Sequence, residues 1–241
     1  MLDSINTVAQ VLNNAGYKTG MVGKWGLGAP NTNSIPNKKG FDFFYGYNCQ
    51  RQAHTFYPTH LWKNESRHIL DNFIVTKQEG LGDLDPNDPI SYNKYNQKDY
   101  APTLMHKEAI DFITRNKNSP FFLYYASPIP HLPLQAPMKW VNYYEKKFGE
   151  EKPYTGKSYY PNKTPKATYA AMISYLDEQV GDLVSKLKDI GEYENTLIIF
   201  TSDNGPTWVD HVDYNFFNST GKFINSTERK EKTTKKYYSR L

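Results

Sequence analysis

The stretch PFFLYYA, residues 120–126, places six apolar or aromatic side chains in a row after its proline. A strand with one face in water alternates apolar and polar residues, and this stretch does not. Unbroken apolar strands are typical of parallel sheets that are covered on both faces. The run LIIF at 197–200 has the same character, and we predict a second such strand over Thr196 to Thr201.

Helical patterns alternate with these strands. We predict helices over Thr7–Ala15, Asp99–Asn116 and Thr168–Ile190, and a short strand over Lys18–Val22. The longest of these helices keeps one apolar face, made of Ile173, Leu176, Val180, Leu183, Val184, Leu187 and Ile190. Alternating helices and strands indicate an α/β layered fold.

The segment from about Asn31 to Lys98 differs from the rest of the chain. It is rich in Asn, Tyr, Pro and Gly and is only weakly periodic. We predict a long irregular insertion at the edge or rim of the sheet, a kind of loop that is often functional.

Composition excludes several classes of protein. The chain has 241 residues, enough for one large domain or a sizeable part of one, and a net charge of +4 that is too weak to indicate nucleic-acid binding. Its single cysteine excludes a disulfide framework and a zinc cluster. No apolar run approaches the roughly 20 residues of a membrane span. Residues 1–4 are not a signal peptide, so we expect either a cytoplasmic protein or a missing N-terminus.

Three unusual stretches follow strands or strand candidates: Gly23-Lys24-Trp25, Pro128-Ile129-Pro130-His131-Leu132-Pro133 and Asp203-Asn204-Gly205. In open α/β sheets, ligands bind at the carboxyl ends of the strands. The three stretches would bring a cation, an imidazole and two oxygen ligands to one rim.

Each stretch also has a plainer interpretation. Asn-Gly favours a hairpin turn, and two oxygen donors alone are too few for Ca²⁺, which takes about six to eight. Gly23-Lys24 lacks the spacing of a phosphate-binding P-loop, so Lys24 is either a solvent-facing side chain or an ammonium held near an anion. His131, between prolines that favour polyproline geometry, is either incidental or a fixed group for acid–base work or anion binding.

The order of these motifs resembles the sulfatase family. The resemblance runs through Gly16-Tyr17-Lys18-Thr19 and Gly23-Lys24-Trp25, then Gly40-Phe41-Asp42, the His131 stretch and Phe200-Thr201-Ser202-Asp203-Asn204-Gly205-Pro206. It covers about Thr7 to Phe217. It implies an alkaline-phosphatase-like α/β fold, a mostly parallel sheet flanked by helices, here incomplete. It also implies hydrolysis of sulfate esters with a formylglycine nucleophile and one Ca²⁺.

The resemblance assigns roles to four residues. Asp203 and Asn204 look like two of the Ca²⁺ ligands, Lys24 looks like the lysine near the formylglycine and the sulfate, and His131 looks like the histidine that contacts the sulfate and the leaving-group oxygen. Members of the family are usually exported, so the resemblance implies a periplasmic or secreted parent protein.

The chain departs from the family pattern in several places. Gly26 stands where the family usually has a histidine, and no Asp-Asp pair or Cys-x-Pro-x-Arg motif precedes Gly16. Cys49, in Asn-Cys-Gln-Arg-Gln, lies on the wrong side of Lys24 to be the nucleophile. Lys222 comes too early for the family's second sulfate-binding lysine. We therefore predict a partial catalytic domain over 1–220, a basic disordered tail over 221–241, and no turnover by this chain.

Two other functions stay open. One is a phosphoryl hydrolase of the same superfamily. The other is a non-catalytic remnant that binds a sulfated saccharide, for which the insertion Asn48–Lys63 offers Arg51, His54, Tyr57, His60 and Trp62. The plainer interpretation of that insertion is ordinary packing under a long loop. For the sulfatase and for the saccharide-binding remnant, we expect a sulfate-ester small molecule or a sulfated saccharide as partner, and we expect no nucleic acid.

Overall fold

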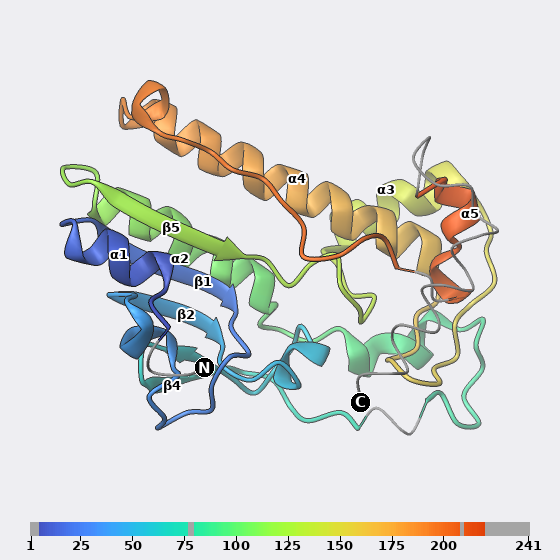
Figure 1. The fold of residues 1–241 in the computed structure, drawn as a ribbon. Coiled ribbons are helices and arrows are strands. Elements are labelled where there is room, and N and C mark those ends of the chain that lie inside the picture. The colour runs from blue at the N-terminus through green and yellow to red at the C-terminus, as the bar shows by residue number, and fades with distance from the viewer. Residues whose placement is uncertain (1–4, 77–79, 208–209, 220–241) are drawn as a thin grey trace, which may run out of the picture. The chain divides into compact units, whose positions relative to one another are not determined.

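Strand β1 (Lys18–Lys24) lies inside a five-stranded sheet whose order is β4-β3-β2-β1-β5 (Figure 1). The computed structural model describes residues 5–76, 80–207 and 210–219, and it divides into two compact units, Met1–Ile198 and Ile199–Leu241. The sheet belongs to the first unit. Strands β2 (Phe43–Tyr47) and β5 (Phe121–Ala126) both pair with β1 in parallel. The carboxyl ends of these three strands therefore meet at one edge.

Two short antiparallel strands extend the sheet beyond β2. They are β3 (His60–Lys63) and β4 (Ser66–Ile69), which form a hairpin. The mostly parallel sheet flanked by helices that the sequence predicts is confirmed, although the hairpin makes the sheet mixed.

Helix α2 (Ala101–Arg115) covers one face of the sheet. Its Phe112 ring lies directly over Gly20 of β1, and its Met105 and Ala109 share a buried cluster with Val22 and Tyr45. Helix α4 (Pro165–Asp189) packs on α2 and on α3 (Met138–Phe148). Burial of these apolar side chains is the main favourable term for holding this layer together.

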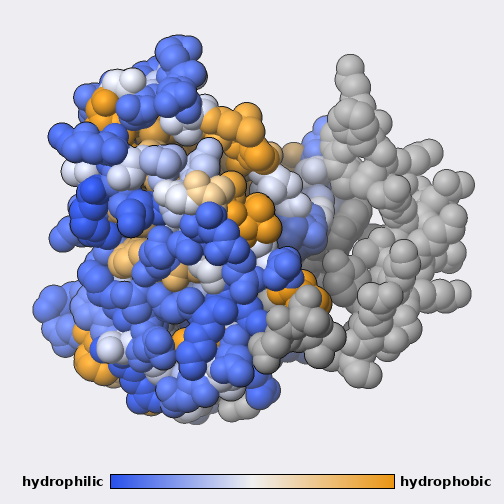
Figure 2. Space-filling view, turned by 60° about the vertical axis from the view of Figure 1, so that its left-hand side comes forward, coloured by the Kyte–Doolittle hydropathy of each residue, from blue (hydrophilic) through white to orange (hydrophobic). Residues whose placement is uncertain are grey.

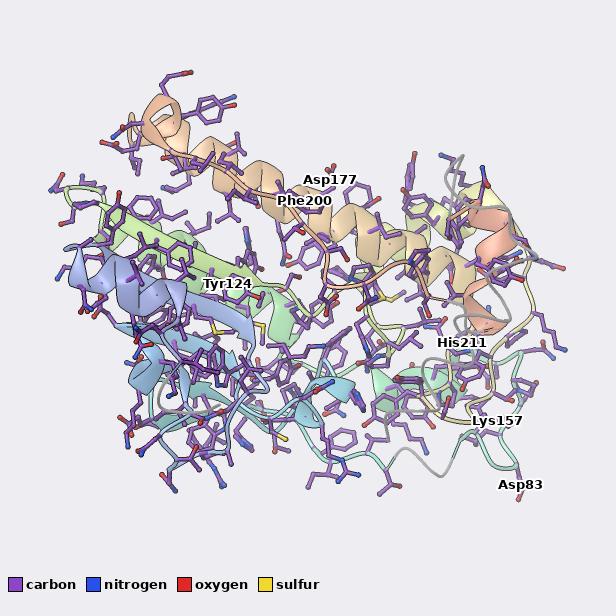
Figure 3. All side chains as sticks on the ribbon, in the orientation of Figure 1. Asp83, Tyr124, Lys157, Asp177, Phe200 and His211 are labelled. Atoms are coloured by element: carbon purple, nitrogen blue, oxygen red, sulfur yellow. The ribbon has the colours of Figure 1, made fainter. Side chains whose placement is uncertain are left out.

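Helix α1 (Val8–Asn14) covers the opposite face over β1. Its Ala9 is fully buried against Met21 and Phe44, together with Phe41 from the loop before β2. Thr7 caps the helix by accepting a hydrogen bond from the backbone N–H of Gln10. This layer does not cover β5 completely, because Tyr124 remains 48% exposed (Figure 3).

A row of small residues crosses the three parallel strands near their carboxyl ends. Gly23 pairs with Gly46 on one side and with Ala126 on the other. A Cβ on Gly46 would overlap the carbonyl oxygen of Gly23, and a Cβ on Gly23 would overlap that of Ala126. Gly23 also has φ +120°, which side-chain-bearing residues rarely adopt. Only glycine lets the three backbones approach so closely.

The helices predicted from periodicity are confirmed, with shifted ends for α1, α2 and α4. Helix α3 was not predicted. The apolar face predicted for α4 is wrong in part. Leu187 is buried, but Ile173 is 42% exposed, and the most buried part of the helix is instead its first turns together with Tyr175 and Gln179.

Two other predictions need correction. The segment 31–98 is not irregular throughout, because it supplies β2, β3 and β4 as well as the 3-10 helices Pro36–Lys39, Gln52–His54 and Pro89–Tyr95. The strand predicted over Thr196–Thr201 does not form. Leu197 is 85% exposed and Phe200 75% exposed, and this run finds no ladder partner among the described residues. A strand exists only when a neighbour satisfies its backbone.

The remaining elements are short. They are the 3-10 helices Tyr193–Asn195 and Asp210–Val212 and helix α5 (Tyr214–Phe217). The tail predicted over 221–241 lies outside the described residues. Hydrophobic side chains surface in separate patches on the face shown in Figure 2. In the described ranges, no helix is both long and apolar enough to cross a bilayer.

The close packing at Ala126, Gly23 and Gly46 can be tested by adding one methyl group at Gly23. We predict that Gly23→Ala lowers the free energy of unfolding by about 3 kcal/mol or more, because the methyl group meets backbone and the residue must hold a positive φ. Gly181 lies in α4 with open space around it. As the control, Gly181→Ala should raise stability by about 0.5–1 kcal/mol. Chemical denaturation of both variants measures this, and equal effects would contradict the account.

Candidate functional site at the carboxyl ends of the parallel strands

Lys24 is the last residue of β1 and stands at the edge where the parallel strands end. Pairing continues just beyond the strands, since the backbone N–H of Trp25 donates to Tyr47 O at 2.9 Å and that of Gly26 donates to Asn48 O at 3.2 Å. The Trp25 indole donates to Ser34 O at 2.7 Å. The backbone on both sides of Lys24 is therefore fixed.

Lys24 is half-buried, and its ammonium has no hydrogen bond or ion pair with the described part of the chain. A structural lysine on a surface commonly pairs with a carboxylate, as Lys63 does with Glu108 and Lys139 with Glu178. An unpaired ammonium at a strand end is free to bind an anion. The structure thus leaves open the functional interpretation of Lys24.

Asn48 follows β2 directly, beside the Lys24 end of β1. It is 2% exposed, and its side-chain Oδ1 is buried without a hydrogen-bond partner among the described residues. A buried amide oxygen without a partner costs free energy, and such groups often mark functional sites. Sequence reasoning named Asn48 only as the start of a segment. Its position immediately after a parallel strand is the signal that would have found it.

His131 lies in a tight turn after β5, not in the extended polyproline geometry expected from its flanking prolines. Its backbone N–H donates to Pro128 O, and the peptide bonds before Pro130 and Pro133 are cis. The ring Nδ1 lies 2.7 Å from Leu132 O. Because a carbonyl only accepts, Nδ1 must carry a proton. The other nitrogen, Nε2, is then the one available to a ligand.

Two aromatic rings hold the imidazole of His131. His54 stacks on it with ring centroids 5.8 Å apart and planes 9° from parallel, and Tyr159 meets both histidines edge-on. His54 ends the one-turn helix Gln52–His54 in the loop after β2. Loops that follow β2 and β5 therefore meet at this pair of rings, a contact that the sequence alone does not reveal.

Gln135 fastens the same two loops in the interior. Its side-chain Oε1 accepts the backbone N–H of Phe56 at 2.9 Å, and its Nε2 donates to Tyr95 O. Its own carbonyl accepts the Tyr100 hydroxyl at 2.7 Å. Gln135 is 2% exposed, so each of these bonds satisfies a group that water cannot reach.

Gly26, at the position where the resemblance implies a histidine, adopts φ +82°. A Cβ there would lie 3.3 Å from the Gln50 Cβ, so a larger residue would need both a strained backbone and a shift of the next loop. The local structure is built for glycine at this position.

The predicted metal ligands Asp203 and Asn204 do not form part of a larger group of metal-binding side chains among the described residues. Asp203 and Asn204 lie in an exposed bend of the second unit, where the Asn204 amide donates to Gly205 O at 2.8 Å. Across 5–76, 80–207 and 210–219, no group of three or more His, Cys, Asp or Glu side chains could hold a metal ion. Two hard oxygen donors suit Ca²⁺ chemically but do not complete its shell. Their assignment as calcium ligands stays a prediction.

Cys49 does not fit a formylglycine precursor. It is an exposed free cysteine followed by Gln50 and Arg51, whereas the family motif places proline two residues after the cysteine. The sequence given contains no such motif.

The insertion residues fall into separate places. Arg51, Tyr57 and His60 line one pocket, His54 contacts His131, and Trp62 belongs to the buried cluster around Met21. The alternative of ordinary packing is correct for Trp62.

Comparisons with known proteins point in one direction. The family model described as Sulfatase matches residues 3–237. Mouse arylsulfatase J is 33% identical over 201 residues, covering 83% of this chain and 29% of its own length. Human N-acetylgalactosamine-6-sulfatase is 29% identical over 224 residues, covering 92% and 36%. The chain thus spans about a third of the curated relatives it matches.

Solved structures with a similar fold point in the same direction. The crystal structure of Ps i-CgsB in complex with k-i-k-neocarrahexaose is 26% identical, with a TM-score of 0.55 over 79% of this chain and 38% of that one. A Bacteroides thetaiotaomicron protein studied for the metabolism of multiple glycosaminoglycans gives a TM-score of 0.61 over 92% and 50%, at 22% identity.

Removing the Gln135 amide should loosen both loops of the site. We predict that Gln135→Leu lowers the free energy of unfolding by about 2–4 kcal/mol, because two buried backbone groups lose their partners. The measurement is chemical denaturation, combined with hydrogen exchange of the Phe56 amide. If Phe56 exchanges as slowly in the variant as in the parent chain, Gln135 does not fasten the loops.

Proposed function

Because the chain belongs to the sulfatase family, we propose that it forms part of an enzyme that hydrolyses sulfate esters of saccharides. The observation that carries this proposal is that Lys24 ends β1 and His131 lies in the turn after the adjacent parallel strand β5, both at the carboxyl edge of the sheet. The saccharide class is supported by the relative that acts on N-acetylgalactosamine 6-sulfate by its name and by the neocarrahexaose complex.

Lys24 serves as the cation for the sulfate group in this proposal. Its ammonium lacks a protein counter-ion in the described residues, so a sulfate oxygen would be its first anionic partner. Negative charge on the sulfuryl oxygens and the departing oxygen needs fixed positive groups during transfer, and a lysine held at a strand end is such a group.

His131 serves at the leaving group. The bond from Nδ1–H to Leu132 O holds one proton in place, so the proton that moves is on Nε2. A protonated Nε2 would donate to the leaving sugar oxygen as the ester S–O bond breaks. Stacking on His54 keeps the ring plane fixed for that transfer.

The family's cofactors belong to the proposal only as expectations. In the parent enzyme, formylglycine would supply a hydrated aldehyde oxygen as nucleophile. Asp203 and Asn204 would give two of the oxygen ligands of Ca²⁺, which neutralises sulfate oxygens. The residues of this sequence complete neither group, so the roles above rest on Lys24 and His131 alone. We also propose export to the periplasm or outside the cell, as for the family.

The first prediction concerns turnover. The purified 241-residue chain should release no 4-nitrophenol from 4-nitrophenyl sulfate above the buffer rate, with or without added calcium, because its sequence holds no formylglycine motif. An absorbance assay over hours measures this. Sustained release of 4-nitrophenol that survives repeated purification would show that another residue acts as nucleophile.

A second prediction concerns binding. N-acetylgalactosamine 6-sulfate should bind the chain, and Lys24→Ala and His131→Ala should each weaken binding about tenfold, as expected for the loss of one charge-assisted bond. Titration by NMR measures these constants.

Lys117 gives the matched control because it is exposed in the turn before β5, at the amino ends of the strands. Lys117→Ala should leave the affinity unchanged. If all three variants bind equally well, the sulfate does not sit at this rim.

A further inference from the structure

A pocket of about 170 Å³ opens beside the His131 loops. Pockets for drug-sized ligands start at about 300 Å³, so this one has room for a single ring. Its lining mixes aromatic residues with neutral polar ones; they include Tyr57, Phe73, Tyr95, Tyr160, Gln52 and Thr59. Such a lining suits a ligand that has both an apolar face and hydroxyl groups.

The pocket shares two loops with the strand ends that carry Lys24 and His131. Arg51 and Gln52 line the pocket, while His54, at the other end of the same helical turn, stacks on His131. Gln135 also lines the pocket and lies four residues after His131. The loops that carry His54 and His131 therefore also contribute residues to the pocket.

Arg51 is the permanently charged residue of the lining. Its guanidinium is exposed and has no hydrogen bond or ion pair with any residue that the structure describes. Burial raises the pKa of Tyr57 to about 12, so its hydroxyl is neutral. Burial, and next the charge of Arg67, lower the pKa of His60, so its imidazole is neutral at pH 7. The pocket therefore presents one cation among neutral groups.

We propose that this pocket holds the sugar ring of an anionic saccharide, with the Arg51 guanidinium binding a carboxylate or a second sulfate on that ring. Guanidinium binds planar oxyanions through paired N–H bonds, which gives direction as well as charge. Exposed Phe73 and Ile74 supply an apolar wall at the mouth. The proposed function enters this proposal only through the statement that a sulfate site lies next to the pocket. Binding of a sugar ring in the pocket can be tested without any sulfate ester.

The experiment compares two sulfate-free probes by NMR titration of the 241-residue chain. Methyl β-D-glucuronide should bind about tenfold more tightly than neutral methyl β-D-glucoside, as expected for one charge-assisted contact. Arg51→Gln should remove this preference while leaving glucoside binding unchanged. Phe73→Ala, at an exposed position that does not threaten folding, should weaken both probes.

Arg115→Gln is the matched control, because Arg115 ends α2 next to the turn that leads into β5. It should preserve the preference for the glucuronide. A titration with inorganic sulfate distinguishes a carboxylate from a sulfate as the partner of Arg51. If Arg51 binds a sulfate, Arg51→Gln should weaken the binding of inorganic sulfate as well.

The proposal is overturned if the parent chain binds both sugars equally, if it binds neither, or if Arg51→Gln keeps the preference. These results are separable from failure of the proposed function. If Lys24→Ala does not change the binding of the sulfated sugar but Arg51→Gln still removes the glucuronide preference, the proposed sulfate site is wrong and the proposed sugar pocket stands.

Discussion

The close approach of three backbones at Ala126, Gly23 and Gly46 is the constraint on which the rest of the structure depends. Because the two glycines have no Cβ, the ends of β5, β1 and β2 pair in register, and all three strands end side by side at the same edge of the sheet. Lys24, Asn48 and the His131 turn are therefore placed at this common edge. Binding residues placed on loops gain their precision from such a rigid base.

The rim combines groups that are costly to leave unpaired. Among the described residues, the Lys24 ammonium and the side-chain amide oxygen of Asn48 lack partners, whereas the Gln135 amide and the Trp25 indole form hydrogen bonds. The pocket beside Arg51 combines an aromatic and neutral polar lining with a guanidinium that has no hydrogen bond or ion pair among the described residues.

Sequence reasoning predicted α1, α2, α4, β1 and β5 because their patterns are local. It missed β2 because Phe-Phe-Tyr-Gly-Tyr lies within a segment rich in loop-forming residues, and its strand character comes from pairing with β1. It predicted a strand at 197–200 because apolar runs favour strands, but pairing is not encoded locally. Lys24 and His131 were predicted as site residues from their motifs, and the structure places both after or at the end of parallel strands. Asn48 and the His54–His131 stack needed the tertiary structure, since the two histidines lie 77 positions apart in the sequence.

The most direct test of the rim is a map of amide chemical shifts as inorganic sulfate is added to the ¹⁵N-labelled chain. The account predicts that the shifts concentrate at the amides of Lys24–Gly26, at Asn48, and at His131 with its ring nitrogens. The turn at 117–119, at the other end of the strands, should stay unchanged. Shifts spread over exposed lysines, or concentrated away from these three strand ends, would contradict it.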